Sequence, residues 1–117
     1  MTILVVDDDV WQADHYAREL RRAGYKVVVA HHAYDAIAQI DTARPSLILL
    51  DLMLPGSNGI ALLHELQSHT DLAAIPVIIA SSQPPKASLA PYGVVAVIDK
   101  TTATNDELIG AIRKALS

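Results

Sequence analysis

Five short apolar runs rich in β-branched residues alternate along the chain with segments whose apolar residues recur at helical spacing. The runs are Ile3–Val6, Lys26–Ala30, Ser46–Leu50, Val77–Ala80 and Val94–Ile98. Near-continuous hydrophobicity over the length of a strand is typical of strands buried on both faces, as in a parallel sheet covered by helices. The alternation therefore predicts an α/β fold with an open, doubly wound parallel sheet and right-handed crossovers.

The segments between these runs have helical periodicity. The first places Val10, Ala13, Ala17 and Leu20 on one face, and Gly24 is expected to end it. The second runs from about Ala33 to Ala43, the third begins near Asn58, and the last covers Asp106 to Leu116. The residues from Thr104 to Glu107 match a capping box, and Asp9 is expected to cap the first helix.

The segment from Gln83 to Tyr92 breaks this pattern because it contains three prolines. Proline disrupts the interior of a helix, which leaves room for one or two helical turns. A parallel crossover normally needs about a dozen residues or more, so this connection is near the lower limit. We expect a short helix or an irregular loop here, in place of a full fourth helix.

Length and composition restrict the class of protein. The 117 residues suit one domain, 1–117, and no apolar run approaches the roughly 20 residues that span a bilayer. The residues from Met1 to Val6 lack the basic stretch of a signal peptide, and the absence of cysteine agrees with a reducing cytoplasm. The net charge of −4, without a basic cluster, argues against direct nucleic-acid binding. Because no apolar run is long enough to span a bilayer, no membrane partner is expected.

Polar side chains follow four of the apolar runs. Asp7-Asp8-Asp9, Asp51, Ser81-Ser82 and Asp99-Lys100 stand at these ends. Ligands of open parallel sheets bind beyond the carboxyl ends of the strands, and neighbouring strands lie about 4.8 Å apart. Two carboxylates about 5 Å apart repel by roughly 3 kcal/mol at an effective dielectric near 20. Such a cluster needs a raised pKa, a nearby cation or a bound metal.

The donor types indicate a hard cation. Carboxylate oxygens without cysteine or nearby histidine suit Mg²⁺, and Lys100 adds a positive charge beside them. A carboxylate nucleophile, a divalent ion, a lysine and a small hydroxyl are the parts needed to transfer a phosphoryl group onto Asp51.

These residues occur in motifs that resemble the response-regulator receiver family, and the resemblance extends from end to end of the chain. The motifs are Ile3-Leu4-Val5-Val6-Asp7-Asp8-Asp9, Leu49-Leu50-Asp51-Leu52-Met53-Leu54-Pro55-Gly56 with Gly59, Pro76-Val77-Ile78-Ile79-Ala80-Ser81, and Lys100. Each motif alone is weak, whereas four in the right order at receiver-like spacing are specific. The resemblance implies a five-stranded sheet of flavodoxin-like order 2-1-3-4-5.

The resemblance also implies roles for individual residues. Asp51 would be the phosphoacceptor, and Asp8, Asp51 and the backbone carbonyl of Met53 would bind Mg²⁺ directly, with Asp7 acting through water. Ser81 would be the hydroxyl that moves toward the phosphoryl group, and Lys100 would pair with that group. The expected function is a phosphorylation-activated signalling switch that catalyses only its own phosphorylation and dephosphorylation.

The same resemblance implies partners. A sensor histidine kinase or a histidine phosphotransfer protein would donate the phosphoryl group in the cytoplasm, and the modified domain would change a protein-interaction surface. The output protein or domain is not identified by the sequence, and a phosphorylation-linked homodimer is one expected form. The chain could be a stand-alone receiver or part of a longer regulator.

The sequence departs from the family pattern at three places. Thr101 follows the lysine where many receivers have a cis proline, so we expect a trans bond at Lys100–Thr101. Val97 stands where the family often has an aromatic ring that rotates inward. The proline-rich connection described above alters the surface that the family usually uses for output.

Other readings remain open or are disfavoured. The altered connection leaves open a protein–protein adaptor that works without phosphorylation. A haloacid-dehalogenase-type phosphatase needs a second aspartate where Met53 stands, and a nucleotide enzyme needs a glycine-rich loop that is missing here. The five histidines match no zinc motif and are expected at the surface. Trp11 is expected to be a partly exposed packing residue.

Overall fold

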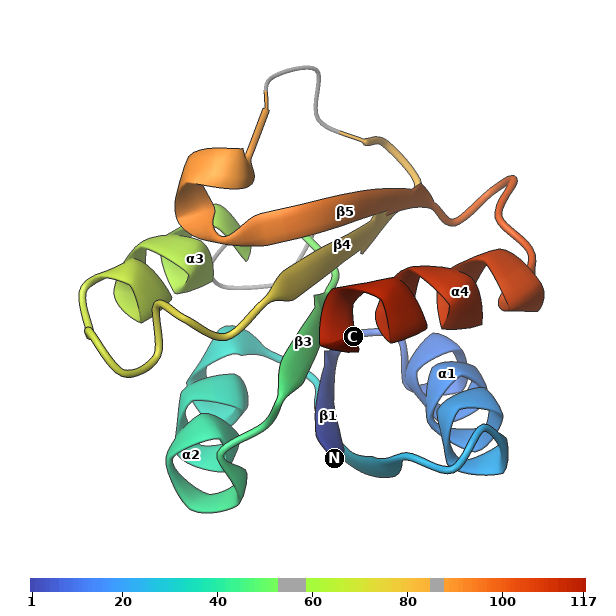
Figure 1. The fold of residues 1–117 in the computed structure, drawn as a ribbon, viewed down its shortest axis with the longest axis horizontal. Coiled ribbons are helices and arrows are strands. Elements are labelled where there is room, and N and C mark those ends of the chain that lie inside the picture. Colours follow the sequence, from blue (N-terminus) through green and yellow to red (C-terminus); the bar gives the residue numbers. More distant parts are fainter. Residues whose placement is uncertain (53–58, 85–87) are drawn as a thin grey trace.

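The computed structural model describes residues 1–52, 59–84 and 88–117, which contain one five-stranded parallel sheet (Figure 1). The strands are β1 (Thr2–Val6), β2 (Lys26–Ala30), β3 (Leu47–Leu50), β4 (Val77–Ser81) and β5 (Val94–Asp99). Their order in the sheet is β2-β1-β3-β4-β5, and every neighbouring pair is parallel. The predicted doubly wound fold and the 2-1-3-4-5 order are thus confirmed.

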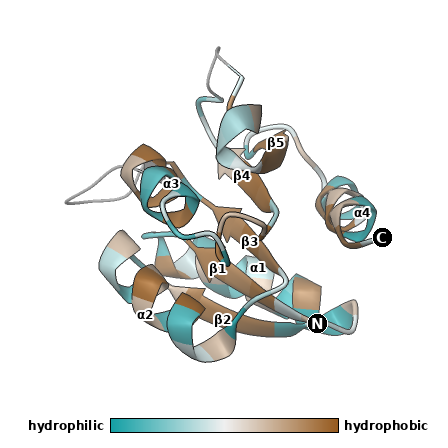
Figure 2. Ribbon diagram, turned by 60° about the vertical axis from the view of Figure 1, so that its left-hand side comes forward, coloured by the Kyte–Doolittle hydropathy of each residue, from teal (hydrophilic) through white to brown (hydrophobic). Residues whose placement is uncertain are grey.

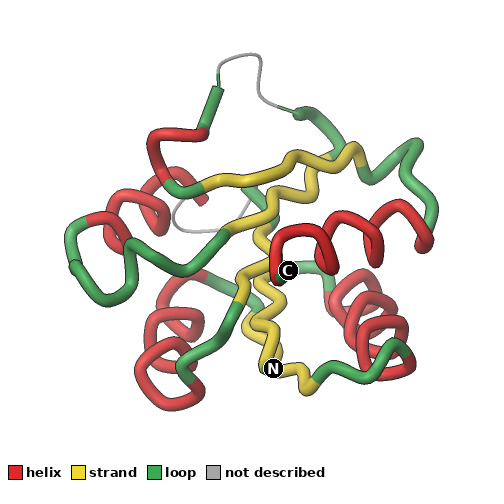
Figure 3. Tube along the Cα trace, viewed as in Figure 1, coloured by secondary structure: helices red, strands yellow, loops and turns green. Residues whose placement is uncertain are grey.

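Helices cover both faces of this sheet. They are α1 (Val10–Arg22), α2 (Ala33–Ala43), α3 (Gly59–Gln67) and α4 (Asn105–Leu116). Helices α1 and α4 lie on one face and α2 and α3 on the other, as the tube in Figure 3 shows. None of the helices in the described ranges combines the length and hydrophobicity that a bilayer span requires.

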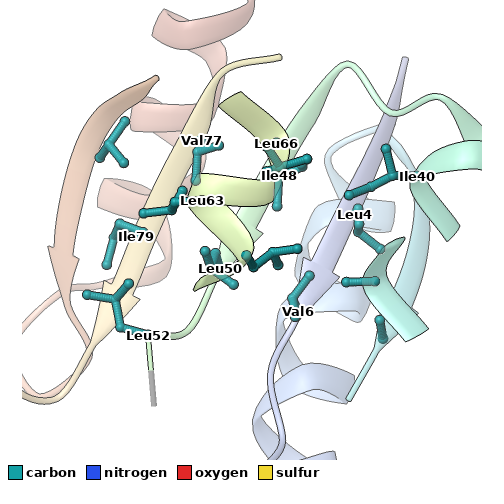
Figure 4. Close-up of a cluster of buried hydrophobic side chains, with 14 of the residues drawn as sticks. Leu4, Val6, Ile40, Ile48, Leu50, Leu52, Leu63, Leu66, Val77 and Ile79 are labelled. Carbon is teal, nitrogen blue, oxygen red and sulfur yellow. The ribbon is translucent and has the colours of Figure 1, made fainter. Parts of the chain in front are cut away.

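Two hydrophobic cores form because side chains alternate between the faces of each strand. On the side of α2 and α3, Leu4, Ile48 and Leu50 pack against Leu63 and other buried residues (Figure 4). The other core holds the alternate strand residues, which pack against α1 and α4. The strands therefore contribute apolar residues to both cores, and Figure 2 shows the central strands in brown. This double burial explains why the sequence pattern identified them.

The helix ends agree with the sequence signals. The carboxylate Oδ1 of Asp9 accepts hydrogen bonds from the backbone N–H groups of Trp11 (3.0 Å) and Gln12 (3.2 Å). The Oγ1 of Thr104 accepts one from the N–H of Glu107 at 3.1 Å, as the capping box predicts. Gly24 follows α1 with a φ of +100°, a conformation that glycine adopts without steric cost. Its position just after the C-cap fixes the end of α1.

We expect replacement of Asp9 by alanine to lower the free energy of unfolding by about 1 kcal/mol, because two N–H groups of α1 lose their acceptor. Urea denaturation followed by circular dichroism measures this change. Asp14→Ala is the matched control, since Asp14 is an exposed carboxylate within the same helix. Equal losses for the two variants would contradict the capping role.

The connection between β4 and β5 differs from the other crossovers. Its described part contains a 3-10 helix, η1 (Ala90–Tyr92), and no α-helix, which agrees with the expected short or irregular segment; residues 85–87 lie outside the described ranges. The pairing of β5 with β4 is irregular at its start, because Val77 pairs with Val94 and Ile78 with Ala96. Val95 is therefore an extra residue in an edge strand, and it is 55% exposed.

Candidate functional site

The carboxyl ends of β1 and β3 bring two aspartates together. Val6 and Leu50 are paired in the sheet, and Asp7 and Asp51 are the next residues of their strands. The N–H of Asp51 donates to the carbonyl of Val6 at 2.9 Å, which continues the ladder past the strand end. Asp7 and Asp51 are both buried. The sequence rule that parallel strands end at one edge therefore located this pair correctly.

Lys100 joins the two carboxylates. It directly follows β5, and its Nζ donates to the Oδ2 of Asp7 at 2.9 Å and to the Oδ2 of Asp51 at 3.0 Å. Its side chain is only 15% exposed. The backbone N–H of Lys100 donates to the carbonyl of Ser81 at 3.0 Å, which fixes the start of the side chain next to the end of β4. The ammonium offsets the repulsion expected between two buried aspartates.

Burial changes the acidity of both partners. Removal from water raises the pKa of the Asp7 carboxyl above its usual range, and the hydrogen bond from Lys100 opposes this shift without reversing it. Burial disfavours the charged form of Lys100, but the hydrogen bonds and charges of Asp7 and Asp51 outweigh it and raise the lysine pKa. Because the pKa of Asp7 is raised on folding, its contribution to stability is present at low pH and is lost as the pH rises through the folded-state value.

Three carboxylates at this edge can converge on one cation. Oxygen atoms of Asp7, Asp8 and Asp51 lie within 4.8 Å of one another. Asp8 is exposed, whereas the other two are buried, so the group opens to solvent on the side of Asp8. Among the described residues, Lys100 contacts two of these three carboxylates, so negative charge remains in excess, and the hard oxygen donors fit a divalent ion such as Mg²⁺. Met53, the fourth predicted ligand, lies outside the described residues.

Ser81 stands at the end of β4, the strand beside β3. Its side chain is buried, and its Oγ accepts a hydrogen bond from the N–H of Gln83 at 3.1 Å. Since β4 lies between β3 and β5, the structure places Ser81 on the strand between those that carry Asp51 and Lys100. The predicted hydroxyl is thus at the same edge, while its movement stays a prediction.

Two residues near the site were not identified from the sequence. The Nδ1 of His31 donates to the backbone carbonyl of Asp7 at 3.0 Å, and His31 is only partly exposed, unlike the surface residue expected. Its position directly after β2 was the signal, because that strand ends at the same edge. Tyr16 of α1 is buried and shares a small cavity with Lys100, and burial raises its pKa. A tyrosine at helical spacing resembles any core residue, so no signal marked it.

Two further expectations have clear outcomes. The described residues contain no cis peptide bond, so Lys100–Thr101 is trans as expected, and Asp99 Oδ1 accepts from both the N–H and the hydroxyl of Thr101 at 2.9 and 2.6 Å. Trp11 was expected to pack partly against its neighbours, but it is 87% exposed. It lies in the first turn of α1, on the face opposite the buried residues Ala13 and Leu20.

Comparison with known proteins identifies the family. The family model for the response regulator receiver domain matches residues 3–113. The phosphate regulon transcriptional regulatory protein PhoB of Pseudomonas aeruginosa is 39% identical over 82 residues, which are 70% of this chain and 36% of PhoB. The sensory transduction protein RegX3 of Mycobacterium tuberculosis is 31% identical over 115 residues, which are 98% of this chain and 50% of RegX3. The chain thus spans about a third to a half of the length of these relatives.

Solved structures agree with this assignment. A CheY-like receiver domain protein from Methanospirillum hungatei is 28% identical with a TM-score of 0.86, covering 98% of this chain and 92% of that one. The chemotaxis response regulator CheY4 of Vibrio cholerae has the same fold, with a TM-score of 0.89 at 20% identity and coverage of 98% of both chains. The chain therefore belongs to the response regulator receiver family, the phosphorylation-activated switches of two-component signalling.

Proposed function

We propose that Asp51 is the phosphoacceptor of this switch and that its phosphorylation depends on Mg²⁺. The observation that carries the proposal is the convergence of Asp7, Asp8, Asp51 and Lys100 at one edge of the sheet. Asp51 lies beside the carboxylates of Asp7 and Asp8 and accepts a hydrogen bond from the ammonium of Lys100. A carboxylate in such surroundings is suited to nucleophilic attack on a phosphoryl group whose charge is balanced locally.

The donor is a phosphohistidine of a sensor histidine kinase or a histidine phosphotransfer protein. A carboxylate oxygen of Asp51 attacks the phosphorus, the bond between phosphorus and the imidazole nitrogen breaks, and that nitrogen takes up a proton. The contribution of the protein is mainly positioning and charge balance, so the domain needs no catalytic activity toward other substrates. Its enzymatic activity is limited to its own phosphorylation and dephosphorylation.

The carboxylates would hold Mg²⁺ in a defined way. Asp8 and Asp51 would bind the ion directly and Asp7 through water, and the backbone carbonyl of Met53, which lies outside the described residues, would be a further ligand. When bound, the ion offsets negative charge on the phosphoryl oxygens. The hard oxygen donors and the excess of carboxylates over ammonium groups support this assignment.

Lys100 and Ser81 respond to the phosphoryl group. The ammonium of Lys100 is already hydrogen-bonded to Asp51, so it pairs with a phosphoryl oxygen through a small shift. Ser81 turns its hydroxyl from the N–H of Gln83 toward the same group. Because Ser81 and Lys100 are joined by a backbone hydrogen bond, their shifts are coupled and can bias a protein-interaction surface.

The wider context is part of the same proposal. Residues 1–117 act as one receiver domain in the cytoplasm, signalling to an output protein or domain by a changed contact surface, with a phosphorylation-linked homodimer as one form. Relatives that are named transcriptional regulatory proteins are longer than this chain, which supports an output domain elsewhere as the nucleic-acid-binding part. The net charge of −4 supports the same division.

Acetyl phosphate provides a direct test. Incubation of the protein with millimolar Mg²⁺ and acetyl phosphate should add one phosphoryl group, seen by intact mass spectrometry, and EDTA should prevent the addition. The adduct should be lost in alkaline hydroxylamine, which cleaves acyl phosphates. Addition that persists equally in EDTA would contradict the metal-dependent mechanism.

An adaptor that works without phosphorylation is the second candidate. It is favoured by the β4–β5 connection, whose described part has no α-helix, and by Val97, which offers no aromatic ring for a switch. The adaptor predicts no adduct with either acetyl phosphate or a phosphorylated histidine kinase. The same mass measurement therefore separates the two candidates.

A further inference from the structure

A groove between α2 and α3 is unrelated to the phosphorylation chemistry. It has a volume of about 280 Å³, and residues of α2, of α3 and of the loop after α3 form its walls. The lining residues are Ile37, Ile40, Asp41, Glu65, Leu66, His69, Asp71 and Leu72. Pockets for drug-sized ligands usually measure roughly 300–1,000 Å³, so this groove suits one or two inserted side chains.

The groove continues into an exposed apolar stripe on α2. Its floor contains the buried residues Ile40, Leu66 and Leu72, whereas Ile37 at its margin is 37% exposed. Tyr34, one turn before Ile37 on the same face of α2, is 84% exposed. Single exposed apolar residues are ordinary, whereas these two share one face of α2, and one of them lines a groove with buried apolar residues.

Carboxylates surround this apolar surface. Asp41, Glu65 and Asp71 all line the groove. Asp71 is paired with Arg44 at 2.6 Å, and Glu65 contacts His69, whose ring nitrogen lies 3.3 Å away. Asp41 belongs to the exposed part of α2. The rim is therefore negative overall, and the whole chain carries −4, so a partner with basic residues is complementary to it.

The position of the groove leaves the phosphorylation site accessible. Ile40 and Asp41 lie near the end of α2, and Leu66 lies near the end of α3. Each helix runs back toward the start of the next strand, so these ends lie near the amino ends of β3 and β4, whereas Asp51 lies at the carboxyl ends. Figure 1 shows α2 and α3 together on one side of the sheet. A partner on this surface and a phosphoryl donor can thus bind at the same time.

We propose that the α2–α3 groove docks a basic amphipathic helix of another protein. Leucine-type side chains of that helix enter the groove and cover Ile37 and Tyr34, while flanking lysines or arginines face Asp41 and Glu65. Helices commonly bind grooves between helices through residues at i, i+3, i+4 and i+7. The surface then tethers the receiver to a partner while Asp51 cycles through its phosphorylation states.

A designed peptide tests the docking. The probe is a short, fluorescently labelled helix with leucine at i, i+3, i+4 and i+7 and lysine or arginine at most other positions. A peptide of the same composition in scrambled order, and one with glutamate in place of the basic residues, are the controls. We expect saturable binding of the first peptide alone, measured by fluorescence anisotropy, with NMR amide shifts centred on Ile37, Ile40, Leu66 and Leu72.

Matched variants locate the surface. Ile37→Glu should weaken binding by about tenfold, and Asp41→Lys by about fivefold, because one removes an apolar contact and the other reverses a rim charge. Val95→Glu and Asp14→Lys make the same changes at exposed residues of β5 and α1, and they should alter the affinity by less than about twofold. Circular dichroism shows that each variant is folded, and labelling by acetyl phosphate should be unchanged in all four.

Several results would overturn the proposal. Equal binding of the scrambled peptide, amide shifts centred away from α2 and α3, or no binding up to millimolar peptide would each do so. A dimer in sedimentation that Ile37→Glu dissociates would assign the surface to a second copy instead. Because the binding measurements need no phosphorylation, their result is independent of whether Asp51 is the phosphoacceptor.

Discussion

Replacing Asp51 by asparagine should abolish phosphorylation by acetyl phosphate and by a histidine phosphodonor. Asparagine has nearly the same shape as aspartate, but its amide is not a nucleophile that can form an acyl phosphate. The fold should survive, because asparagine fills the same space, and loss of the Asp51 charge removes its repulsion with Asp7, which keeps Lys100 as its hydrogen-bond partner. Intact mass spectrometry after incubation with Mg²⁺ and acetyl phosphate measures the loss.

Asp99→Asn is the matched control for this variant. Asp99 also ends a strand at this edge, but its carboxylate accepts hydrogen bonds from Thr101. These bonds hold the pKa of Asp99 below its usual range, and the residue is partly exposed. The control protein should therefore still gain the phosphoryl group. An adduct of the same yield and rate in Asp51→Asn would show that another residue is the acceptor.

Replacing Lys100 by methionine should destabilise the metal-free protein and make its stability strongly dependent on pH. Methionine keeps most of the volume of lysine but removes the ammonium that bridges Asp7 and Asp51. Breaking a buried ion pair typically costs roughly 3–5 kcal/mol. We expect a loss of about 2 kcal/mol here, because Lys100 is partly exposed and one carboxylate can take up a proton.

The loss of stability in Lys100→Met should increase with pH. Without Lys100 the pKa of Asp7 rises further, so the loss should be larger at about pH 8, where Asp7 has to be ionised without the ammonium, than at about pH 5, where it takes up a proton more readily. Millimolar Mg²⁺ should recover part of the loss, because a divalent ion replaces the missing positive charge. Urea denaturation at the two pH values measures both changes, with the exposed Lys114→Met as control. A loss that does not respond to pH would contradict the charge argument.

The fold could be predicted from the sequence largely because its strands are buried on both faces. Leu47 to Leu50 and Val77 to Ala80 are continuously apolar and buried, so their pattern indicates strands covered by helices on both faces. The observed strands β4 and β5 each extend one residue further, into Ser81 and Asp99. Ser81 and Asp99 still pair through their backbones, but their polar side chains do not continue the apolar pattern by which the strands were predicted. The predicted strands therefore ended one residue early. The order of the strands came from the family resemblance, because periodicity does not specify neighbours.

The site was predictable in its composition but less so in its contacts. The rule that parallel strands end at one edge placed Asp7, Asp51 and Lys100 together. It did not reveal that Lys100 bridges both carboxylates, because that depends on how far a four-carbon side chain reaches over the sheet. The contact of His31 with the backbone of Asp7 was missed for a similar reason, since it rests on a rotamer and not on a pattern.

The extra residue at Val95 bears on the solubility of the protein. Strand β5 lies at the end of the sheet, and Val95 and Val97 are 55% and 44% exposed. An apolar strand at the end of a sheet can act as a template on which other chains add strands and aggregate. A bulge interrupts the regular spacing of the free N–H and C=O groups and twists the strand locally. The irregular start of β5 thus makes the edge a poorer template for aggregation than its sequence suggests.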